Sequence, residues 1–322
     1  MSKHCIIPVI LLLLTAGLGG CKKTPQTADT LQAAPFSGDS AYRYIAEQVA
    51  FGPRVPGTTA HYECARYLRG QLERFGATVE TQQGQMPDYR GEMQPVVNLI
   101  ARFDGNRPGI LLCAHWDGRP WADQEEEYAD RMRPVTGAND GASGPGVLLE
   151  IARQLGMREK NGPAVDIVLF DCEDMGTPDF YTGRQREDTW CLGSQLWAKS
   201  VRDSKQYRYG ILLDMVGSPE AVFPKEYHSM EFAAQYTERV WRTARRLGYS
   251  TLFRDEVCYP ITDDHYYINT LAGIPCIDII HYDPHSSTGF GHYWHTLHDD
   301  MSAVSPATPE AVGKVVLTTI LN

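Results

Sequence analysis

Three short apolar runs in this sequence each end in acidic residues or histidine. The first run is followed by His115 and Asp117, the second by Glu173 and Asp174, and the third by Asp214. In open α/β sheets, ligands bind just beyond the carboxyl ends of the strands. If the runs are parallel strands, these side chains therefore meet at one edge of a sheet.

Two further segments add polar side chains to this set. A glycine-rich turn, 137–144, carries Asp140 just ahead of a helical stretch, and a late segment carries His295 followed by Thr296. Carboxylates that converge on one edge repel one another, and a divalent cation resolves that conflict. Histidine and carboxylate ligands without thiolate suit Zn²⁺ in a catalytic site. The sequence therefore predicts a metal site, and the alternative is a set of unrelated solvated turns and helix caps.

The elements that must position these residues alternate between strands and helices. Short, β-branched apolar runs predict strands buried on both faces. They lie at Val96–Phe103, Gly109–Ala114, Val165–Phe170, Tyr209–Leu213 and Ile274–Ile280. Helical periodicity predicts helices from Ser37 and at Thr59–Phe75, Gly146–Leu155, Ser194–Val201, Ser229–Leu247 and Pro306–Leu321. This order predicts an α/β fold, a three-layer sandwich with a central mixed, mostly parallel sheet flanked by helices.

The first twenty residues differ in composition from the rest. A weakly basic start precedes a short apolar run, Ile6–Leu14, and the tetrad Leu18-Gly19-Gly20-Cys21 resembles the lipobox of bacterial lipoproteins. We expect residues 1–20 to be a signal peptide, 21–36 a tether lipid-anchored through Cys21, and 37–322 a single catalytic domain. The protein is then exported to the periplasmic face or cell envelope of a Gram-negative bacterium. A plain secretory signal with an incidental cysteine is the alternative.

Composition narrows the classes of function. The 322 residues carry a net charge of −10, which argues against nucleic-acid binding, because affinity there depends on Lys and Arg. Six cysteines outside the leader show no C-x-x-C spacing, so a structural zinc cluster is not expected, and the sequence assigns no disulfide pairing. The acidic run Asp123–Glu127 is expected to be a solvated loop, and the alternative is that it rims the active-site cleft.

Together, the polar motifs resemble the metal signature of the zinc aminopeptidase clan, which includes dizinc aminopeptidases and monozinc glutaminyl cyclases. The resemblance runs from about Tyr42 to Asn322. Its motifs, in order, are His115-x-Asp117, Asp140 in Asn-Asp-Gly-Ala-Ser-Gly, Glu173-Asp174, Asp214 and His295-Thr296. Trp294 directly before His295, and the segment Asp263-Asp264-His265, favour the cyclases. The 116–121 region and the lipobox are similar to those of the exported cyclases of Gram-negative bacteria.

The resemblance implies a metal centre with a single zinc ion per chain. Asp140, Asp174 and His295 would bind that ion. His115 would hold a second metal, as in the aminopeptidases, or hydrogen-bond beside the first. Animal cyclases have a glutamate where this chain has Asp174, and a histidine where it has Asp278.

The resemblance also implies the reaction and the residues that perform it. An N-terminal glutamine of a peptide or protein would become pyroglutamate with release of ammonia. Glu173 would be the general acid/base, Asp214 and Asp263 its hydrogen-bonded partners, and Trp294 and Phe290 pocket walls. The long insert at 177–190 leaves the second pocket tryptophan unplaced, and Trp190 is a candidate for it.

Two alternatives to a cyclase remain open, and we expect a monomer in each case. In a dizinc aminopeptidase, Glu173 would activate a water while His115 and Asp214 hold the second metal. A catalytically silent binding domain on the same fold would keep Glu173 and the ligands only by chance. The same metal ligands serve both reactions, so they do not distinguish a cyclase from an aminopeptidase. Trp294 before His295, and the segment Asp263-Asp264-His265, favour the cyclase.

Overall fold

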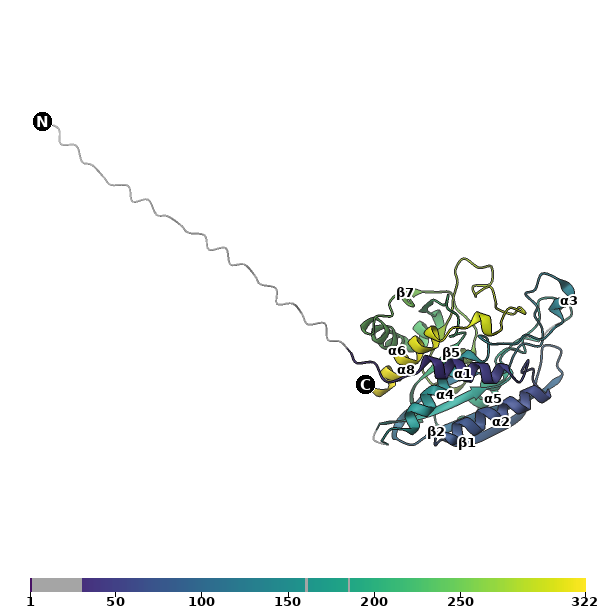
Figure 1. Ribbon diagram of the computed structural model, residues 1–322, viewed down its shortest axis with the longest axis horizontal. Coiled ribbons are helices and arrows are strands. Elements are labelled where there is room, and N and C mark those ends of the chain that lie inside the picture. The colour runs from purple at the N-terminus through teal and green to yellow at the C-terminus, as the bar shows by residue number, and fades with distance from the viewer. Residues whose placement is uncertain (2–30, 160–161, 185) are drawn as a thin grey trace. The chain divides into compact units, whose positions relative to one another are not determined.

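The computed structural model describes residue 1 and residues 31–159, 162–184 and 186–322, and residues 31–322 form one compact unit (Figure 1). The expected signal peptide beyond Met1 and the lipobox with Cys21 lie outside the described residues. The backbone N–H of Ala34 donates to Thr318 Oγ1, and Phe36 is buried in the main core. The packed body therefore includes the last residues of the expected tether. None of the described helices combines the length and the apolar composition that crossing a membrane requires.

A six-stranded sheet forms the centre of the body, in the order β1-β2-β4-β3-β5-β8. The strands are β1 Thr78–Pro87, β2 Met93–Phe103, β3 Asn106–His115, β4 Pro163–Phe170, β5 Tyr207–Asp214 and β8 Cys276–Ile280. β2 pairs antiparallel with β1 and β4, whereas β3 pairs parallel with β4 and β5, and β5 with β8. The predicted mixed, mostly parallel sheet is confirmed.

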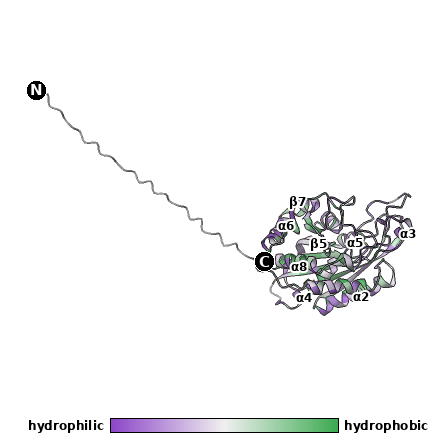
Figure 2. Ribbon diagram, turned by 45° about the horizontal axis from the view of Figure 1, so that its top comes forward, coloured by the Kyte–Doolittle hydropathy of each residue, from purple (hydrophilic) through white to green (hydrophobic). Residues whose placement is uncertain are grey.

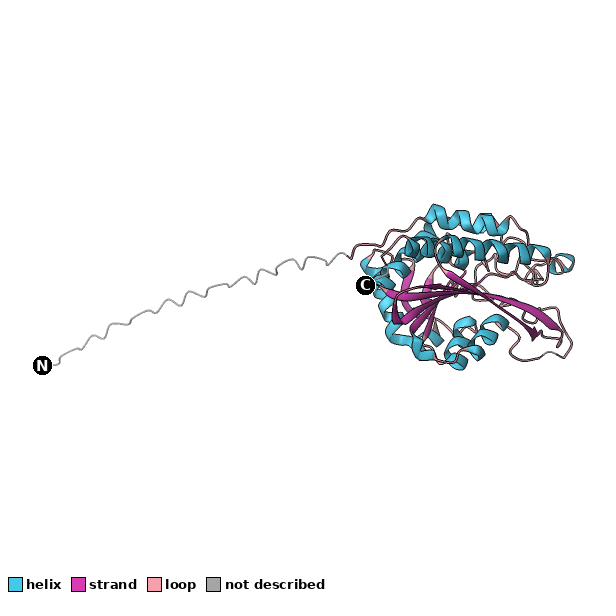
Figure 3. Cartoon of the chain, turned by 90° about the horizontal axis from the view of Figure 1, so that it is seen from below, coloured by secondary structure: helices cyan, strands magenta, loops and turns pink. Residues whose placement is uncertain are grey.

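Helices cover both faces of this sheet, which makes it the middle of three layers (Figure 3). One face packs against α1 Gly38–Val49, α2 Thr59–Arg74, α4 Ser143–Gly156, α6 Tyr227–Arg246 and α8 Ala307–Leu321. The other packs against α5 Leu192–Ser200 and the turn η2 Ile268–Ala272, which follows α7 Asp264–Tyr267. The short elements α3 Tyr128–Arg131, η1 Ser204–Gln206 and η3 Met301–Ala303 lie in the connections.

Alternating side chains of the central strands build two cores. On β3, Ile110 and Leu112 belong to the core under α4, and Leu111 and Cys113 to the core under α5. Hydrophobic residues accordingly concentrate along β5 and α8, while α3 is hydrophilic (Figure 2). β3 to β5 are apolar on both faces apart from the buried Asp166 in β4, so most of their polar residues lie at the strand ends.

Three strands were not predicted from the sequence. β1 is a half-exposed edge strand rich in Thr and Gln, so it lacks the apolar run of a buried strand. β6 Phe223–Lys225 and β7 Phe253–Val257 form a separate two-stranded parallel sheet and are only three and five residues long. The last predicted strand begins at Cys276 rather than Ile274, because Gly273 at φ +65° ends the preceding turn and Pro275 follows it.

Candidate active site

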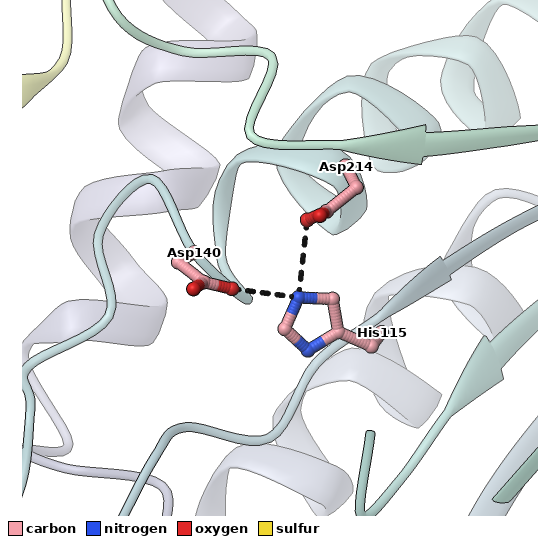
Figure 4. A group of neighbouring side chains, drawn as sticks. All are labelled: His115, Asp140 and Asp214. Atoms are coloured by element: carbon pink, nitrogen blue, oxygen red, sulfur yellow. Dashed lines mark hydrogen bonds and ion pairs between the residues drawn. The ribbon is translucent and has the colours of Figure 1, made fainter. Parts of the chain in front are cut away.

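The carboxyl ends of the central strands bring the predicted polar residues together. His115 ends β3, Asp214 ends β5, and Asp140 arrives from the glycine-rich turn before α4. His115 Nε2 lies 3.0 Å from Asp140 Oδ1 and 3.2 Å from Asp214 Oδ1 (Figure 4). All three side chains are buried.

The three residues expected to share a zinc ion lie around one point. Ligand atoms of Asp140, Asp174 and His295 are all within 4.8 Å of one another. His295 Nε2 is 3.1 Å from Asp174 Oδ1 and 3.7 Å from Asp140 Oδ2. Asp174 Oδ2 is buried and has no hydrogen-bond partner among the described residues. A buried carboxylate oxygen without a partner is costly, and a cation at this point would satisfy it.

The electrostatics of the cluster favour a cation for the same reason. Burial raises the pKa of Asp140, and the neighbouring charge of Asp174 raises it further. Burial likewise raises the pKa of Asp214. Burial would lower the pKa of His115, but hydrogen bonds to surrounding carboxylates hold it well above its usual value. Carboxylates and imidazoles without a thiolate are ligands that zinc accepts, so these residues fit the metal.

Backbone contacts fix the two acids after β4. Asp117 accepts hydrogen bonds from the backbone N–H groups of Glu173 at 3.1 Å and Asp174 at 3.2 Å. Asp171, at the end of the same strand, pairs with His61 at 2.8 Å, and His61 was not found from the sequence. These contacts hold the adjacent loop rigid, which is what a metal ligand requires.

A second carboxylate holds the turn that carries Asp140. Asp299 accepts hydrogen bonds from the backbone N–H groups of Asn139 at 2.7 Å and Asp140 at 3.0 Å. Gly141 has φ +102°, and a Cβ there would lie 2.0 Å from the carbonyl oxygen of Asp117. Only glycine fits this close approach, so the turn can bring Asp140 next to His115.

His295 is supported through its outer ring nitrogen. Asp123 Oδ1 lies 3.3 Å from His295 Nδ1, and Arg119 binds both oxygens of Asp123 at 2.8 and 2.7 Å. Arg119 also donates to the carbonyl oxygen of Asp174 at 2.9 Å. Asp123 was expected in a solvated loop, and this is wrong, because the side chain is buried against a buried guanidinium.

Glu173 lies beside this cluster in a protected position. The thiol of Cys191 donates to its carboxylate, with 3.1 Å between Sγ and Oε1. Ligand atoms of Glu173, Cys191 and Asp263 are within 4.8 Å of one another. Burial raises the pKa of Glu173 well above its usual value, and the charge of Asp174 adds to this. A carboxyl group whose protonated form is favoured in this way can accept and return a proton.

The predicted partner acids are Asp214 and Asp263, and a carboxylate oxygen of Asp263 lies within 4.8 Å of one of Glu173. Burial and the charge of Asp214 raise the pKa of Asp263 to about 7. Asp263 also caps α7, with its side chain accepting from the backbone N–H of Asp264. Asp278 is buried as well, and its Oδ2 lies 3.6 Å from His265 Nδ1.

Aromatic rings line the cavity above these residues. Trp294 stacks on His295 with 3.6 Å between ring centroids, and Trp190 stacks on the same ring at 5.9 Å and 10°. Phe290 packs against Trp294 at 4.8 Å. Trp190, Trp294 and Phe290 all line a cavity of about 700 Å³ that also contains Asp140, Glu173 and Asp174. The insert therefore supplies a second tryptophan, which the sequence left as a candidate.

Backbone strain is concentrated around this cavity. Among the described residues, the non-glycine positions with positive φ are Cys172, Asp188, Cys191, Met215 and His295. Cys172 precedes Glu173, Met215 follows Asp214, and the other three contact the cluster or line the cavity. Such conformations cost about 1–3 kcal/mol each and cluster at functional sites.

The fold and the metal-binding rim define a member of a known enzyme family. Residues 98–320 match the model of Peptidase family M28, and the chain belongs to that family. It is similar to a Zn-dependent exopeptidase from Parabacteroides distasonis, with 47% identity over 90% of this chain and 100% of the other, at a TM-score of 0.87.

Two further solved structures resemble the chain equally well. They are the glutaminyl cyclase of Tannerella forsythia, at 48% identity over 90% of this chain and 99% of the other, and that of Bacteroides thetaiotaomicron bound to N-acetylhistamine, at 46% identity with the same coverage. Both have a TM-score of 0.86. None of the curated proteins compared with the chain matches it. The resemblance expected from the motifs is confirmed.

Proposed function

We propose that the protein is a zinc-dependent glutaminyl-peptide cyclotransferase with one zinc ion per chain. It would convert the N-terminal glutamine of peptides and proteins to pyroglutamate. The α-amine nitrogen attacks the γ-carboxamide carbon, a new C–N bond closes the ring, and the old C–N bond breaks to release ammonia. One arrangement of side chains carries this proposal. Glu173 is buried with a raised pKa next to the three candidate metal ligands, and two tryptophans line the cavity that contains them.

The metal set would orient the substrate. Asp140, Asp174 and His295 would hold the ion, and His115 would hydrogen-bond beside it to Asp140 and Asp214. When bound, zinc polarises a carbonyl oxygen and stabilises the negative charge that develops there. Both reacting groups belong to one residue, so the protein must mainly fix the folded conformer.

Glu173 would move the proton between the two nitrogens. It takes a proton from the attacking α-amine and delivers it to the departing amide nitrogen, which leaves as ammonia. Asp263 would act as its partner, because its charge opposes ionisation of Glu173, and Asp214 would act through Asp263, whose pKa its charge raises. This order returns Glu173 to its starting state in each turnover.

The aromatic walls would select the substrate side chain. Trp190 and Trp294 both stack on His295, and Phe290 packs behind Trp294. Flat rings cover the planar carboxamide and keep bulk water away from the reacting atoms.

Dizinc peptide hydrolysis is the competing function, and one observation favours it. A second group of residues could hold a metal ion, and it shares Asp140 with the first. Its members are His115, Asp140 and Asp214. Three of the similar structures are described as a Zn-dependent exopeptidase, a putative Zn-dependent exopeptidase and a leucine aminopeptidase precursor. Against this, several glutaminyl cyclases are similar to the chain at 41–48% identity.

A peptide assay separates the two reactions. The purified protein is incubated with Gln-, Leu- and Ala-initiated peptides of the same length, and the products are read by mass spectrometry. The cyclase account predicts that only the Gln peptide reacts and that it loses one ammonia. Release of free N-terminal amino acids from the other peptides would establish the exopeptidase instead.

The location of the protein is a separate proposal. We propose that it is exported and held at the periplasmic face or cell envelope of a Gram-negative bacterium by a lipid on Cys21, and that it acts there as a monomer. The support is the signal-like Ile6–Leu14 run and the tetrad that ends in Cys21. Replacing Cys21 by serine should release the protein from the membrane fraction, and unchanged fractionation would reject the anchor.

A further inference from the structure

A second cavity adjoins the active-site cavity on one side. It has a volume of about 880 Å³ and shares the residues Tyr259, Tyr282 and Ser286 with the active-site cavity. The two cavities therefore lie side by side, with these three side chains between them. None of the residues assigned to metal binding or proton transfer lines the second cavity.

The walls of this cavity are tied together by backbone hydrogen bonds. They come from the small β6–β7 sheet and from the segment that follows β8. Tyr282 N donates to Val222 O at 3.0 Å, Cys258 N donates to Lys225 O at 3.0 Å, and Asp283 N donates to Gly289 O at 2.8 Å. Backbone segments that are hydrogen-bonded to one another therefore fix the shape of the cavity.

The cavity surface exposes an unusual amount of apolar area. Tyr259 is 77% exposed, Val257 54% and Tyr227 47%, and all three line the cavity. Clustered exposed apolar side chains mark binding surfaces, because covering them removes apolar area from water. Charged groups of the wall partly pair with each other, as His292 does with Glu220 at 3.7 Å. The exposed apolar side chains therefore offer a surface that an apolar occupant can cover, next to charged residues such as Arg254 and Glu256.

We propose that this cavity is a subsite for the residues that follow the N-terminal glutamine, and that it prefers large apolar side chains. The inference rests on the proposed function. A glutamine held beneath Trp190 and Trp294 must direct the rest of its peptide out of the catalytic cavity. An extended peptide advances about 3.3 Å per residue. A peptide that leaves the catalytic cavity over Tyr259 and Tyr282 would reach the second cavity next, because both side chains line both cavities.

The test compares substrates that do and do not reach the cavity. kcat/KM is measured for glutamine amide, for Gln-Gly-Phe-Leu-amide and for Gln-Gly-Asp-Gly-amide. Burial of one large apolar side chain is worth about 1.5 kcal/mol, so the apolar tetrapeptide should exceed the polar one about tenfold. Equal values for the two tetrapeptides would overturn the proposal.

A double variant locates the effect. In Tyr227→Ser/Val257→Ser, the advantage of the apolar tetrapeptide should fall to about twofold or less. Tyr62→Ser is the matched control, because Tyr62 is 45% exposed on α2 and lines neither cavity. An advantage that survives in the double variant, or disappears in the control, would place the subsite elsewhere.

Failure of the proposed function gives a different result. If glutamine amide and both tetrapeptides are not cyclised, the cyclase proposal falls. In that case, calorimetry measures the affinity of the same two tetrapeptides for the unmodified protein and for the double variant. These affinities decide whether the second cavity binds apolar side chains. Preference for the apolar peptide that the double variant loses supports the subsite, and equal affinities reject it.

Discussion

The thiol of Cys191 and the carboxylate of Glu173 form a direct hydrogen bond, with 3.1 Å between Sγ and Oε1. The backbone N–H of Cys191 also donates to the carbonyl oxygen of Glu173 at 2.9 Å. Burial and the charge of Glu173 raise the pKa of the thiol well above its usual value, so it stays protonated and can donate. Cys191 therefore positions the group that we propose as the proton shuttle.

Replacing Cys191 tests this positioning. Cys191→Ala removes the donor and should lower kcat about five- to tenfold with little change in KM, since such a bond is worth about 1 kcal/mol. Cys191→Ser keeps a donor and should recover most of the loss. Cys64→Ala, which removes a buried thiol on α2, is the control. Equal losses in the serine and alanine variants would contradict a hydrogen-bonding role.

The proton shuttle itself is tested by Glu173→Gln. Glutamine has nearly the same shape but cannot exchange a proton, so we expect most turnover to disappear, by about a hundredfold or more. Bound zinc should remain, because Glu173 is outside the proposed ligand set. Kinetics and metal analysis of the same sample check both statements. A variant with near-normal turnover would remove Glu173 from the mechanism.

Asp123 is predicted to tune metal affinity without touching the metal. Its carboxylate faces the outer nitrogen of His295 at 3.3 Å. Loss of such a partner lowers metal affinity by about 10- to 100-fold. Asp123→Asn should show this loss in a chelator competition, whereas Asp130→Asn, in the neighbouring α3, should not. Unaltered affinity in Asp123→Asn would show that the contact is incidental.

His281 should make the fold sensitive to mild acid. Burial lowers its pKa to about 4, whereas an unfolded histidine has a pKa of about 6.5. Between these values the unfolded chain binds more protons, so stability contributed by neutral His281 is complete above about pH 6.5 and is lost as the pH falls towards 4.

Urea unfolding at pH 7 and pH 5 measures this effect. His281→Gln keeps a polar group near the Tyr293 hydroxyl, which lies 2.6 Å from His281 Nδ1. We expect the variant to lose about 2 kcal/mol less free energy of unfolding than the unmodified protein between these pH values. The same loss in both proteins would show that His281 is not the sensitive group.

The residues at the strand ends could be predicted because each apolar run and the polar residues after it are neighbours in the sequence. A run that is apolar on both faces must be a buried strand, and the polar residues that follow it can only lie at its end. This reasoning placed His115, Glu173, Asp174 and Asp214 on one edge, as the structure has them. Asp140 and His295 follow no predicted strand; a glycine-rich turn and a His-Thr segment added them to the set, and only their assignment as ligands of the single zinc came from the family resemblance.

The supporting residues could not be predicted, since each acts across a large separation in the chain. Asp299 holds the backbone of Asp140, 159 residues away, and Cys191 reaches Glu173 from the far end of an insert. Asp123 stands in an acidic run, so composition indicates a solvated loop. Its burial depends on Arg119 being fully enclosed, and that is a property of the tertiary packing alone.

The number of zinc ions bound per chain distinguishes a cyclase from a dizinc peptidase most directly. Native mass spectrometry of the unmodified protein, His115→Ala and His295→Ala counts the ions that each chain holds. Our account predicts one ion in the unmodified protein, its retention in His115→Ala and its loss in His295→Ala. Two ions in the unmodified protein, one of which leaves with His115, would contradict the cyclase assignment and establish the dinuclear centre of a peptidase.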